Sequence, residues 1–321
     1  MHSFEELSAA FADRFSQRHF PDQPASLYEP GAYFLSMGGK RIRPVLCVMG
    51  NELFAPIEDD AWQLAIAIEL FHNFTLIHDD IMDRAPLRRG MTTVHEKYGA
   101  PTAILSGDVM MVASYAAIAK IGSPHIRRIL HLYNQAASHV CEGQQLDMDF
   151  ERRSDVRMEE YLHMIGLKTS VLLAASLQIG AILGGAGLGN QDKIYQFGKN
   201  LGLAFQIQDD YLDCYGDTAK VGKKAGGDIL ADKKTFLLVK TLEVATDAQR
   251  RRILELETAP ADEKIAGMLD LFRACGVDAW VRELKEDYRR AAYQCLEDIA
   301  VLSSRKGPLR QLTDFLLQRE F

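Results

Sequence analysis

One acidic pentapeptide, Asp-Asp-Ile-Met-Asp at residues 79–83, constrains this chain more than any other stretch. It closes an apolar segment, residues 65–78, in which apolar side chains recur every three or four positions, and this spacing predicts a buried helix. At about 100° per residue, Asp79 and Asp83 fall on one face of that helix, one turn apart. Two carboxylates held that close repel each other. A cation is therefore expected beside them, and carboxylate oxygens suit Mg²⁺.

A second copy of the pattern argues against a merely solvated acidic helix end. Residues 209–213, Asp-Asp-Tyr-Leu-Asp, follow another helix-compatible apolar run at residues 200–208. They again space two carboxylates four residues apart, which places both on one helix face. We interpret the two copies as ion-binding helix ends that face each other across a cavity.

Helical periodicity covers most of the remaining chain, and alternating strand patterns are nearly absent. With 321 residues, 47% of them hydrophobic, the chain can bury a large core. We therefore predict an all-α fold in which residues 1–321 form a single-domain helical bundle around a central cavity.

Charge and cysteine usage narrow the class of protein. The net charge is −7 and there is no basic tail, so nucleic acid is not expected as a partner. Five cysteines are scattered singly, which indicates reduced thiols and a cytoplasmic protein. The N-terminus lacks a signal-peptide pattern, and no run of eighteen uninterrupted apolar residues predicts a membrane span.

Basic residues accompany the first acidic motif. Residues 38–44, GGKRIRP, give a flexible turn with three cations before a helix start, which is either an anion cradle or a basic surface turn. Arg88 and Arg89 follow the motif in a loop, where they would neutralise the carboxylates or share an anion with them. His72 lies two helical turns before Asp79, so its ring is either a ligand in the same cavity or a satisfied core histidine.

Basic residues also accompany the second motif. Residues 216–235 lack hydrophobic periodicity and predict either a mobile loop that folds over an anionic ligand or a solvated charged loop. The lysines of this stretch are Lys220, Lys223, Lys224, Lys233 and Lys234. Lys168, followed by Thr169, interrupts an apolar stretch and must reach an anionic partner or water. Near the end of the preceding helical pattern, Gln144 and Asp147 lie within one turn.

Two opposed acidic clusters, each trailed by cations, describe a binuclear or trinuclear Mg²⁺ site for a diphosphate. The ions would bridge the carboxylates to the diphosphate oxygens, and basic side chains would take the remaining charge. Such a site favours departure of diphosphate from carbon, because it stabilises the charge that develops on the leaving group. The apolar helix beside it would accommodate a hydrocarbon chain.

The motifs GGKRIRP, DDIMD with LRRG, GQQLD, KTS, FQIQDDYLD and a GK…D…K loop occur in one order and spacing. In this the chain resembles the trans-isoprenyl diphosphate synthases, or polyprenyl synthetases, of the short-chain geranylgeranyl or farnesyl type. The resemblance implies an Mg²⁺-dependent, head-to-tail condensation of isopentenyl diphosphate with dimethylallyl, geranyl or farnesyl diphosphate. It also implies a homodimer of all-α subunits and three Mg²⁺ ions with substrate bound, with Mn²⁺ as the alternative ion.

The resemblance carries roles onto particular residues. It implies that the metal ligands are Asp79, Asp83 and Asp209, supported by Asp80, Asp210 and Asp213. It implies an isopentenyl diphosphate pocket of Lys40, Arg43, His72, Arg89 and Phe205. It implies contacts to the allylic diphosphate from Arg88, Lys168, Lys223 and Lys233. It implies stabilisation of the carbocation by Thr169 and Gln206. The departing diphosphate would take the proton, so no side-chain base is required.

Product length would depend on residues that precede Asp79. Phe74, five positions upstream, is a bulky stop beside the small Thr75, and Phe71 lies a turn further back. This pattern resembles geranylgeranyl (C20) synthases, with farnesyl (C15) as the alternative. Two other functions stay open: a terpene cyclase and a non-catalytic prenyl synthase subunit. The cations at residues 38–44 argue against a terpene cyclase. The two intact acidic motifs argue against a non-catalytic subunit.

Overall fold

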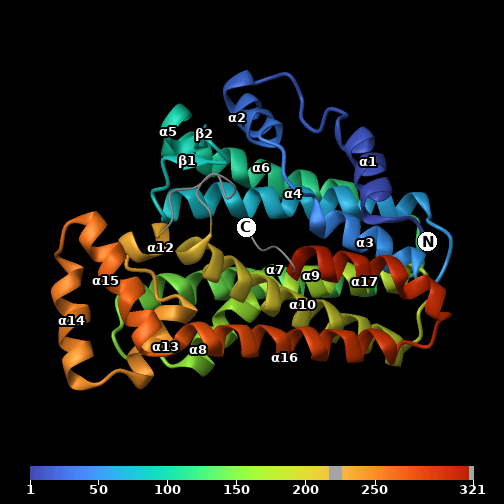
Figure 1. Cartoon of the computed structure of the whole chain (residues 1–321). Helices are drawn as coiled ribbons and strands as arrows, with labels where there is room; N and C mark the ends of the chain where they lie inside the picture. The colour runs from blue at the N-terminus through green and yellow to red at the C-terminus, as the bar shows by residue number, and fades with distance from the viewer. Residues whose placement is uncertain (217–225, 318–321) are drawn as a thin grey trace. The chain divides into compact units, whose positions relative to one another are not determined.

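The computed structural model describes residues 1–216 and 226–317, and these residues form the predicted all-α fold (Figure 1). The helices of the first half are α1 (Phe4–Phe15), α2 (Ala25–Ser36), α3 (Ile42–Glu52), α4 (Asp59–Met82), α5 (Val94–Tyr98), α6 (Ala100–Ile118) and α7 (Ile126–Glu151). Those of the second half are α8 (Met158–Ile165), the π-helix η1 (Gly166–Ser170), α9 (Val171–Leu183), α10 (Leu188–Tyr215), α12 (Gly227–Leu230), α13 (Phe236–Val244), α14 (Asp247–Glu257), α15 (Ala261–Ala274), α16 (Val277–Glu297) and α17 (Ser303–Leu317). Within the described residues, the strands are limited to one hairpin of β1 (Leu87–Arg88) and β2 (Met91–Thr92).

The chain forms two compact units. Unit 1 comprises Met1–Gln135, Ala175–Tyr195 and Ile299–Leu309, and unit 2 comprises Ala136–Ala174, Gln196–Asp298 and Arg310–Phe321. The first acidic motif belongs to unit 1 and the second to unit 2. The single domain, and the facing of the two motifs across a cavity, therefore stay predictions.

Unit 1 is organised around α4, which packs against α3 and runs alongside α6 (Figure 1). Its apolar face is fully buried at Leu64, Ile68 and Phe71, and each such side chain contributes about 1.5–3 kcal/mol by leaving water. The Ser114 hydroxyl of α6 donates to the Ala67 carbonyl of α4 at 2.7 Å. This packing fixes the helix whose last turn carries the first acidic motif.

The chain opens with the amphipathic helix α1. Its N-terminus is capped by Ser3, whose hydroxyl accepts from the Glu6 backbone while the Glu6 carboxylate accepts from the Ser3 backbone. Phe11 and Phe15 are buried, and their rings stack 5.1 Å apart. α1 therefore covers one side of unit 1 next to α3.

Unit 2 has its own apolar core, to which α8, α10, α13, α15 and α16 contribute. Phe236 of α13 stacks on Trp280 of α16 with ring centroids 4.7 Å apart, and the ring of Tyr161 meets Phe236 edge-on at 6.2 Å. This aromatic group backs the segment of α10 that carries the second acidic motif.

Two helical stretches, Ala100–Ile118 and Met158–Leu183, are long and apolar enough to cross a membrane by length and composition alone. In the second, 83% of the apolar window is buried inside the protein, as in the core helix of a globular fold, against 39% in the first. The expected absence of a membrane span stays a prediction.

Candidate functional site

The first acidic motif occupies the last turn of α4, and Asp83 is its C-cap. Arg88, on β1, bonds two of its carboxylates: Nε donates to Asp80 Oδ1 at 2.7 Å and Nη2 to Asp79 Oδ2 at 3.1 Å. The C-terminus of a helix carries partial negative charge, and the last turn of α4 contains no basic residue. Two carboxylates bonded by Arg88, with a third at the C-cap, make this helix end acidic and suited to binding cations.

Asp80 is more deeply buried than Asp79 and Asp83. Its side chain is 1% exposed, and burial raises the pKa of its carboxyl group. One oxygen is bonded by Arg88, whereas no group of the described residues donates a hydrogen bond to the buried Oδ2. Asp79 and Asp83 are only partly buried. The half-open pair is suited to binding an ion directly, and Asp80 to holding Arg88 in place.

Asp79 and Asp83 fit an Mg²⁺ ion whose remaining ligands come from the substrate. Within the described ranges, no three His, Cys, Asp or Glu side chains converge as a preformed metal cage. Mg²⁺ is usually held by one or two carboxylates together with substrate phosphates and water, so such a cage is not required. The oxygen-only donors at Asp79 and Asp83 match this preference.

The GGKRIRP turn precedes α3 with an unusual backbone. Gly38, Gly39 and Arg41 have φ values of 74°, 143° and 52°. At Gly39 a Cβ atom would lie 2.9 Å from the guanidinium nitrogens of Arg89, and Nη1 of Arg89 donates to the Gly38 carbonyl. The positive φ favours glycine at this position, and the absence of a Cβ leaves room for the Arg89 guanidinium.

Arg43 and His72 meet across α3 and α4. Nη1 of Arg43 lies 3.1 Å from Nε2 of His72. Burial, followed by the charges of Arg43 and its neighbouring arginines, lowers the pKa of His72 well below its usual value. The neutral ring accepts the hydrogen bond from Arg43. The structure thus brings together Arg43 and His72, with Arg89 at the turn that contains Lys40.

Arg41 points to a different partner from the other cations of this turn. Its guanidinium forms an ion pair with Glu69, a buried carboxylate within α4, and lies over the Phe15 ring at 4.9 Å. Asn73 also donates to Glu69, at 2.8 Å. Of the three cations expected to form an anion cradle, Arg41 therefore anchors the turn to α4.

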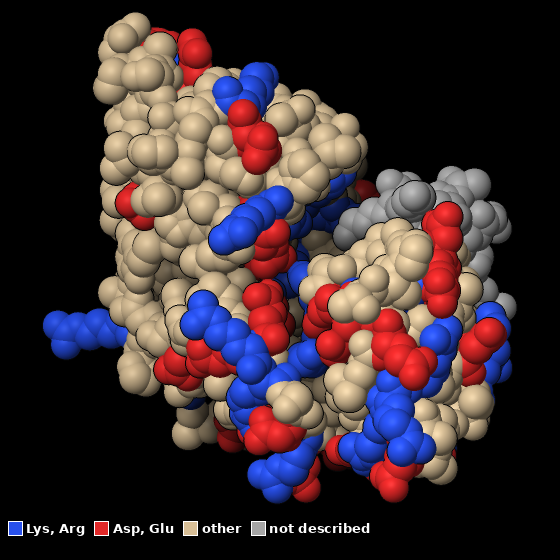
Figure 2. All heavy atoms as spheres, turned by 90° about the vertical axis from the view of Figure 1, so that its left-hand side faces the viewer, with Lys and Arg blue, Asp and Glu red and all other residues tan. Residues whose placement is uncertain are grey.

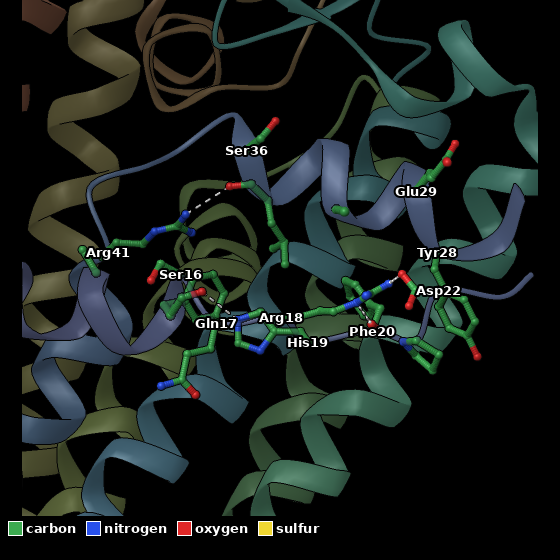
Figure 3. A pocket seen from close by; sticks show the side chains of 15 residues that line it. Ser16, Gln17, Arg18, His19, Phe20, Asp22, Tyr28, Glu29, Ser36 and Arg41 are labelled. Carbon is green, nitrogen blue, oxygen red and sulfur yellow. Dashed lines mark hydrogen bonds and ion pairs between the residues drawn. The ribbon is translucent and has the colours of Figure 1, made fainter. Parts of the chain in front are cut away.

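A cavity of unit 1 lies next to Arg41 of this turn (Figure 3). It measures about 480 Å³ and is lined by residues of α1, α2 and the connection between them, together with Arg41. Two of its cations have carboxylate partners: Arg18 pairs with Asp22 (Figure 3), and Arg41 pairs with Glu69. None of the predicted substrate-binding residues lines it, so the cavity is distinct from the predicted substrate site.

The predicted chain-length residues lie along α4. The ring of Phe74 meets His78 at 4.7 Å and Phe71 at 5.6 Å, and Phe71 contacts the buried Tyr133 at 5.5 Å. The Thr75 hydroxyl donates to the His72 carbonyl at 2.8 Å. Phe74 is thus backed by aromatic rings that restrict its movement.

In unit 2, the second acidic motif lies near the C-terminal end of α10, and its three carboxylates differ in burial and in their partners. Asp209 is exposed, and Asp213 is half-buried with Oδ2 accepting from the Asp228 backbone at 2.9 Å. Asp210 is 6% exposed, and burial raises its pKa to about 7. Its carboxylate accepts from the Tyr161 hydroxyl and, at 2.9 Å, from the Gln206 amide. These contacts are compatible with the supporting role predicted for Asp210, and Asp209 stays the candidate ligand of this motif.

Lys168 and Thr169 lie on η1, a single turn of π-helix between α8 and α9. Such turns often occur at functional sites. A Cβ atom on Gly143 of α7 would lie 2.3 Å from the Lys168 backbone nitrogen, and one on Gly202 of α10 would lie 2.7 Å from the Cα atom of Ser170. These two glycines let both helices press against the π-turn, which fixes the backbone of Lys168 and Thr169.

The side chains of the π-turn have identified partners. Nζ of Lys168 donates to Asp147 at 2.5 Å, which confirms that this lysine reaches an anion. Oγ1 of Thr169 donates to Oε1 of Gln206 at 3.0 Å. Asp147 belongs to the GQQLD motif, so α7 supplies both the glycine contact and the ion pair.

The remaining predicted residues are less constrained. Phe205 is half-buried on α10 beside Gln206. Lys233 is half-buried between α12 and α13, where its backbone donates to the Asp228 carbonyl at 3.1 Å. Lys223 lies outside the described residues, as do Lys220 and Lys224, so the predicted loop closure stays a prediction.

Three functional candidates were missed by the sequence reasoning. Glu69 is an acidic residue inside an apolar helical run, a signal that could have marked it as paired. Gly143 lies within the GQQLD motif, but the sequence does not explain why this position must be glycine. Tyr161 carried no signal, because its partner Asp210 lies 49 residues away.

Comparison with known proteins assigns this arrangement to a family. The sequence pattern described as Polyprenyl synthetase matches residues 24–271. A geranylgeranyl diphosphate synthase of Sulfolobus acidocaldarius is 36% identical, over 98% of this chain and 97% of the relative. A geranylfarnesyl diphosphate synthase of Natronomonas pharaonis is 33% identical over 100% of both chains. A crystal structure of a geranylgeranyl pyrophosphate synthase superposes with a TM-score of 0.94 and 39% identity, over 100% of both chains. With the motifs and the fold in agreement, the chain belongs to the polyprenyl synthetase family.

Proposed function

We propose that this prenyltransferase condenses isopentenyl diphosphate with an allylic diphosphate, head to tail, and releases diphosphate. The supporting observation is that unit 1 carries two sets of cations with different partners. Arg88 bonds the carboxylates of Asp79 and Asp80, whereas Arg43 contacts neutral His72 and Arg89 lies on the glycine turn. One diphosphate held through ions on carboxylates, and another held directly by cations, are what a two-substrate condensation needs.

The ion-dependent half of the site is proposed to bind the allylic diphosphate. Mg²⁺, when bound to Asp79, Asp83 and Asp209, would neutralise the charge that develops on the leaving diphosphate. Arg88 and Lys168 would orient the same group, Arg88 from its position on the carboxylates and Lys168 from its position beside Asp147. Mn²⁺ is the alternative ion for an oxygen-only site.

The other half of the site is proposed to bind isopentenyl diphosphate through Lys40, Arg43 and Arg89. Because the His72 ring is neutral, it adds no positive charge of its own and instead orients the Arg43 guanidinium. The glycine turn leaves room for a phosphate group close to the backbone. Phe205 would contact the hydrocarbon part of this substrate.

The carbon chemistry needs electron-rich groups and no side-chain base. As the allylic C–O bond breaks, positive charge develops on carbon, and the oxygens of Thr169 and Gln206, 3.0 Å apart, would stabilise it. The double bond of isopentenyl diphosphate then forms the new C–C bond. The proton lost from the product passes to the released diphosphate.

Geranylgeranyl diphosphate (C20) is the proposed product. Phe74 lies about 7.5 Å before Asp79 by helical rise and is backed by Phe71. The small Thr75 leaves room beside it, which argues against the shorter farnesyl (C15) product. Geranylgeranyl and geranylfarnesyl synthases both occur among the relatives, so the product profile is the property to measure first.

A homodimer is proposed from the outer face of α6. Ile104, Leu105 and Val112 are 44%, 56% and 67% exposed. Large apolar side chains gathered on one helix suit an interface with a second copy. Light scattering of the purified protein should give the mass of a dimer, and Val112→Glu should shift it towards the monomer.

The proposed setting is the cytoplasm, without a nucleic-acid partner. All five cysteines are free thiols, as expected in a reducing compartment. Figure 2 shows one face on which acidic and basic side chains are interspersed instead of forming a patch of one sign. Arg252 of α14, for example, pairs with Glu255 and with Glu263 of α15.

Turnover by the purified chain tests the proposal. With dimethylallyl and isopentenyl diphosphates and Mg²⁺, we expect a C20 prenyl diphosphate by mass spectrometry and loss of activity with a chelator. Asp79→Asn should abolish turnover with an unchanged circular dichroism spectrum, because it removes a charged ion ligand. Allylic diphosphate consumed without isopentenyl diphosphate would instead indicate a terpene cyclase. A folded chain without any turnover would indicate a non-catalytic subunit.

A further inference from the structure

Four side chains of unit 2 form one continuous chain of hydrogen bonds. The Tyr161 hydroxyl donates to Oδ2 of Asp210. Oδ1 of Asp210 accepts from Nε2 of Gln206 at 2.9 Å, and Oε1 of Gln206 accepts from Thr169 at 3.0 Å. The chain therefore runs from the buried core of unit 2 to the π-turn.

The two ends of the Gln206 amide are chemically different. The oxygen end can stabilise a carbocation, whereas the NH₂ end would oppose it. In its ionised form Asp210 only accepts hydrogen bonds, so it selects the orientation in which NH₂ faces inward and the oxygen faces Thr169. Without that contact, a rotation of the amide about its last bond would exchange the two ends.

Asp210 is itself fixed by the core. In addition to the Tyr161 hydroxyl, the Phe236 backbone N–H lies 3.5 Å from Oδ2. Tyr161 is 2% exposed, and its ring packs against Phe236, which stacks on Trp280. A buried, connected polar network of this kind is rigid.

We propose that Tyr161 and Asp210 are positioning residues that hold the Gln206 amide with its oxygen toward the developing allylic cation. The proposal rests on the proposed function, because the cation arises only in the condensation. It gives Asp210, the middle carboxylate of this part of the motif, a role other than binding a metal ion. Tyr161 contributes through Asp210 and touches no substrate.

Tyr161→Phe tests the proposal, because it removes the hydroxyl and keeps the ring in the core. We expect kcat to fall about 10- to 100-fold, as when an orienting partner is lost elsewhere, with KM unchanged for both substrates. The matched control is Tyr293→Phe, which removes another tyrosine–aspartate hydrogen bond of unit 2, to Asp314 at 2.7 Å. That control should keep the wild-type kcat.

A binding measurement separates positioning from a general structural effect. An allylic diphosphate analogue with a protonated amine in place of the cationic carbon should bind the Tyr161→Phe variant more weakly, by about the factor lost in kcat. An uncharged, unreactive analogue should bind the variant as it binds the wild type. Equal losses for both analogues would overturn the proposal.

Further variants keep the test decisive. If circular dichroism shows that Tyr161→Phe does not fold, Asp210→Asn serves instead. It removes one of the two acceptor oxygens and is expected to weaken binding of the amine analogue selectively.

In a Gln206→Leu background, Tyr161→Phe should cause no further loss of kcat, because the amide is absent. An additive loss would overturn the proposal. An inactive wild type would refute the proposed function itself, whereas an active wild type with an equally active Tyr161→Phe variant would refute only the positioning role.

Discussion

The ion pair between Arg41 and Glu69 should be necessary both for stability and for isopentenyl diphosphate binding. The side chain of Glu69 is 3% exposed and that of Arg41 is 12% exposed. Asn73 donates to the same carboxylate at 2.8 Å, and its other contact, to the Glu69 backbone at 2.6 Å, does not depend on it. Glu69→Ala would therefore leave the Arg41 guanidinium in the protein interior without its carboxylate.

The expected cost follows from that burial. Removing one partner of a buried ion pair costs about 3–5 kcal/mol, because the remaining charge is uncompensated. Replacing both partners with apolar side chains of similar size often costs almost nothing, because no charge is left behind. Glu69→Ala should thus lower the free energy of unfolding by about 3–5 kcal/mol, and the double variant Arg41→Met/Glu69→Leu by far less than the sum of its single variants.

Urea unfolding followed by circular dichroism measures these free energies, and steady-state kinetics measures the effect on the turn. Because Arg41 anchors the turn that carries Lys40 and Arg43, KM for isopentenyl diphosphate should rise in Glu69→Ala while kcat at saturation is retained. Arg18→Ala breaks an exposed ion pair and serves as the control with little expected change. A single variant that costs less than about 1 kcal/mol, or a double variant that costs the sum, would refute the reasoning.

Three further predictions concern other parts of the site. Phe74→Ala should lengthen the product, and an unchanged profile by chromatography would place the floor of the pocket elsewhere. Gly143→Ala should destabilise the fold by about 1–3 kcal/mol and reduce kcat, because its Cβ would overlap the π-turn backbone, whereas Gly307→Ala meets open space and should be neutral in the same melt. Burial lowers the pKa of His72 in the folded protein. As the pH falls below about 6.5, the His72 ring therefore binds a proton in the unfolded chain but stays neutral in the folded one. Stability should therefore fall as the pH drops through that range, and His72→Gln should make the fall shallower in urea titrations at each pH.

The fold class and most candidate residues could be predicted from short sequence patterns. The three- to four-residue spacing of apolar side chains predicted α4, and the acidic motif at its end is confirmed in the last helical turn. The lone Lys168 in an apolar stretch predicted either an anionic partner or contact with water, and the partner is Asp147. Such inferences succeed because they depend on neighbours within one or two helical turns.

The different roles of chemically similar neighbouring residues could not be predicted in this way. In the sequence, Arg41 is one of three cations in a turn and Asp210 is one of three aspartates in a motif. Their partners, Glu69 and Tyr161, lie 28 and 49 residues away. No local pattern distinguishes a cation that anchors a turn from one that meets substrate.

Local patterns in the chain were enough to identify the helices, the acidic ends of α4 and α10, and the family. The pairing of Lys168 with Asp147, the pairing of Arg41 with Glu69, and the close contact of α7 and α10 with the π-turn at two glycines became visible only in the folded protein. Helix formation and charge crowding act between residues close in the chain. The direction of a buried polar side chain is instead set by whichever distant partner satisfies it in the folded core.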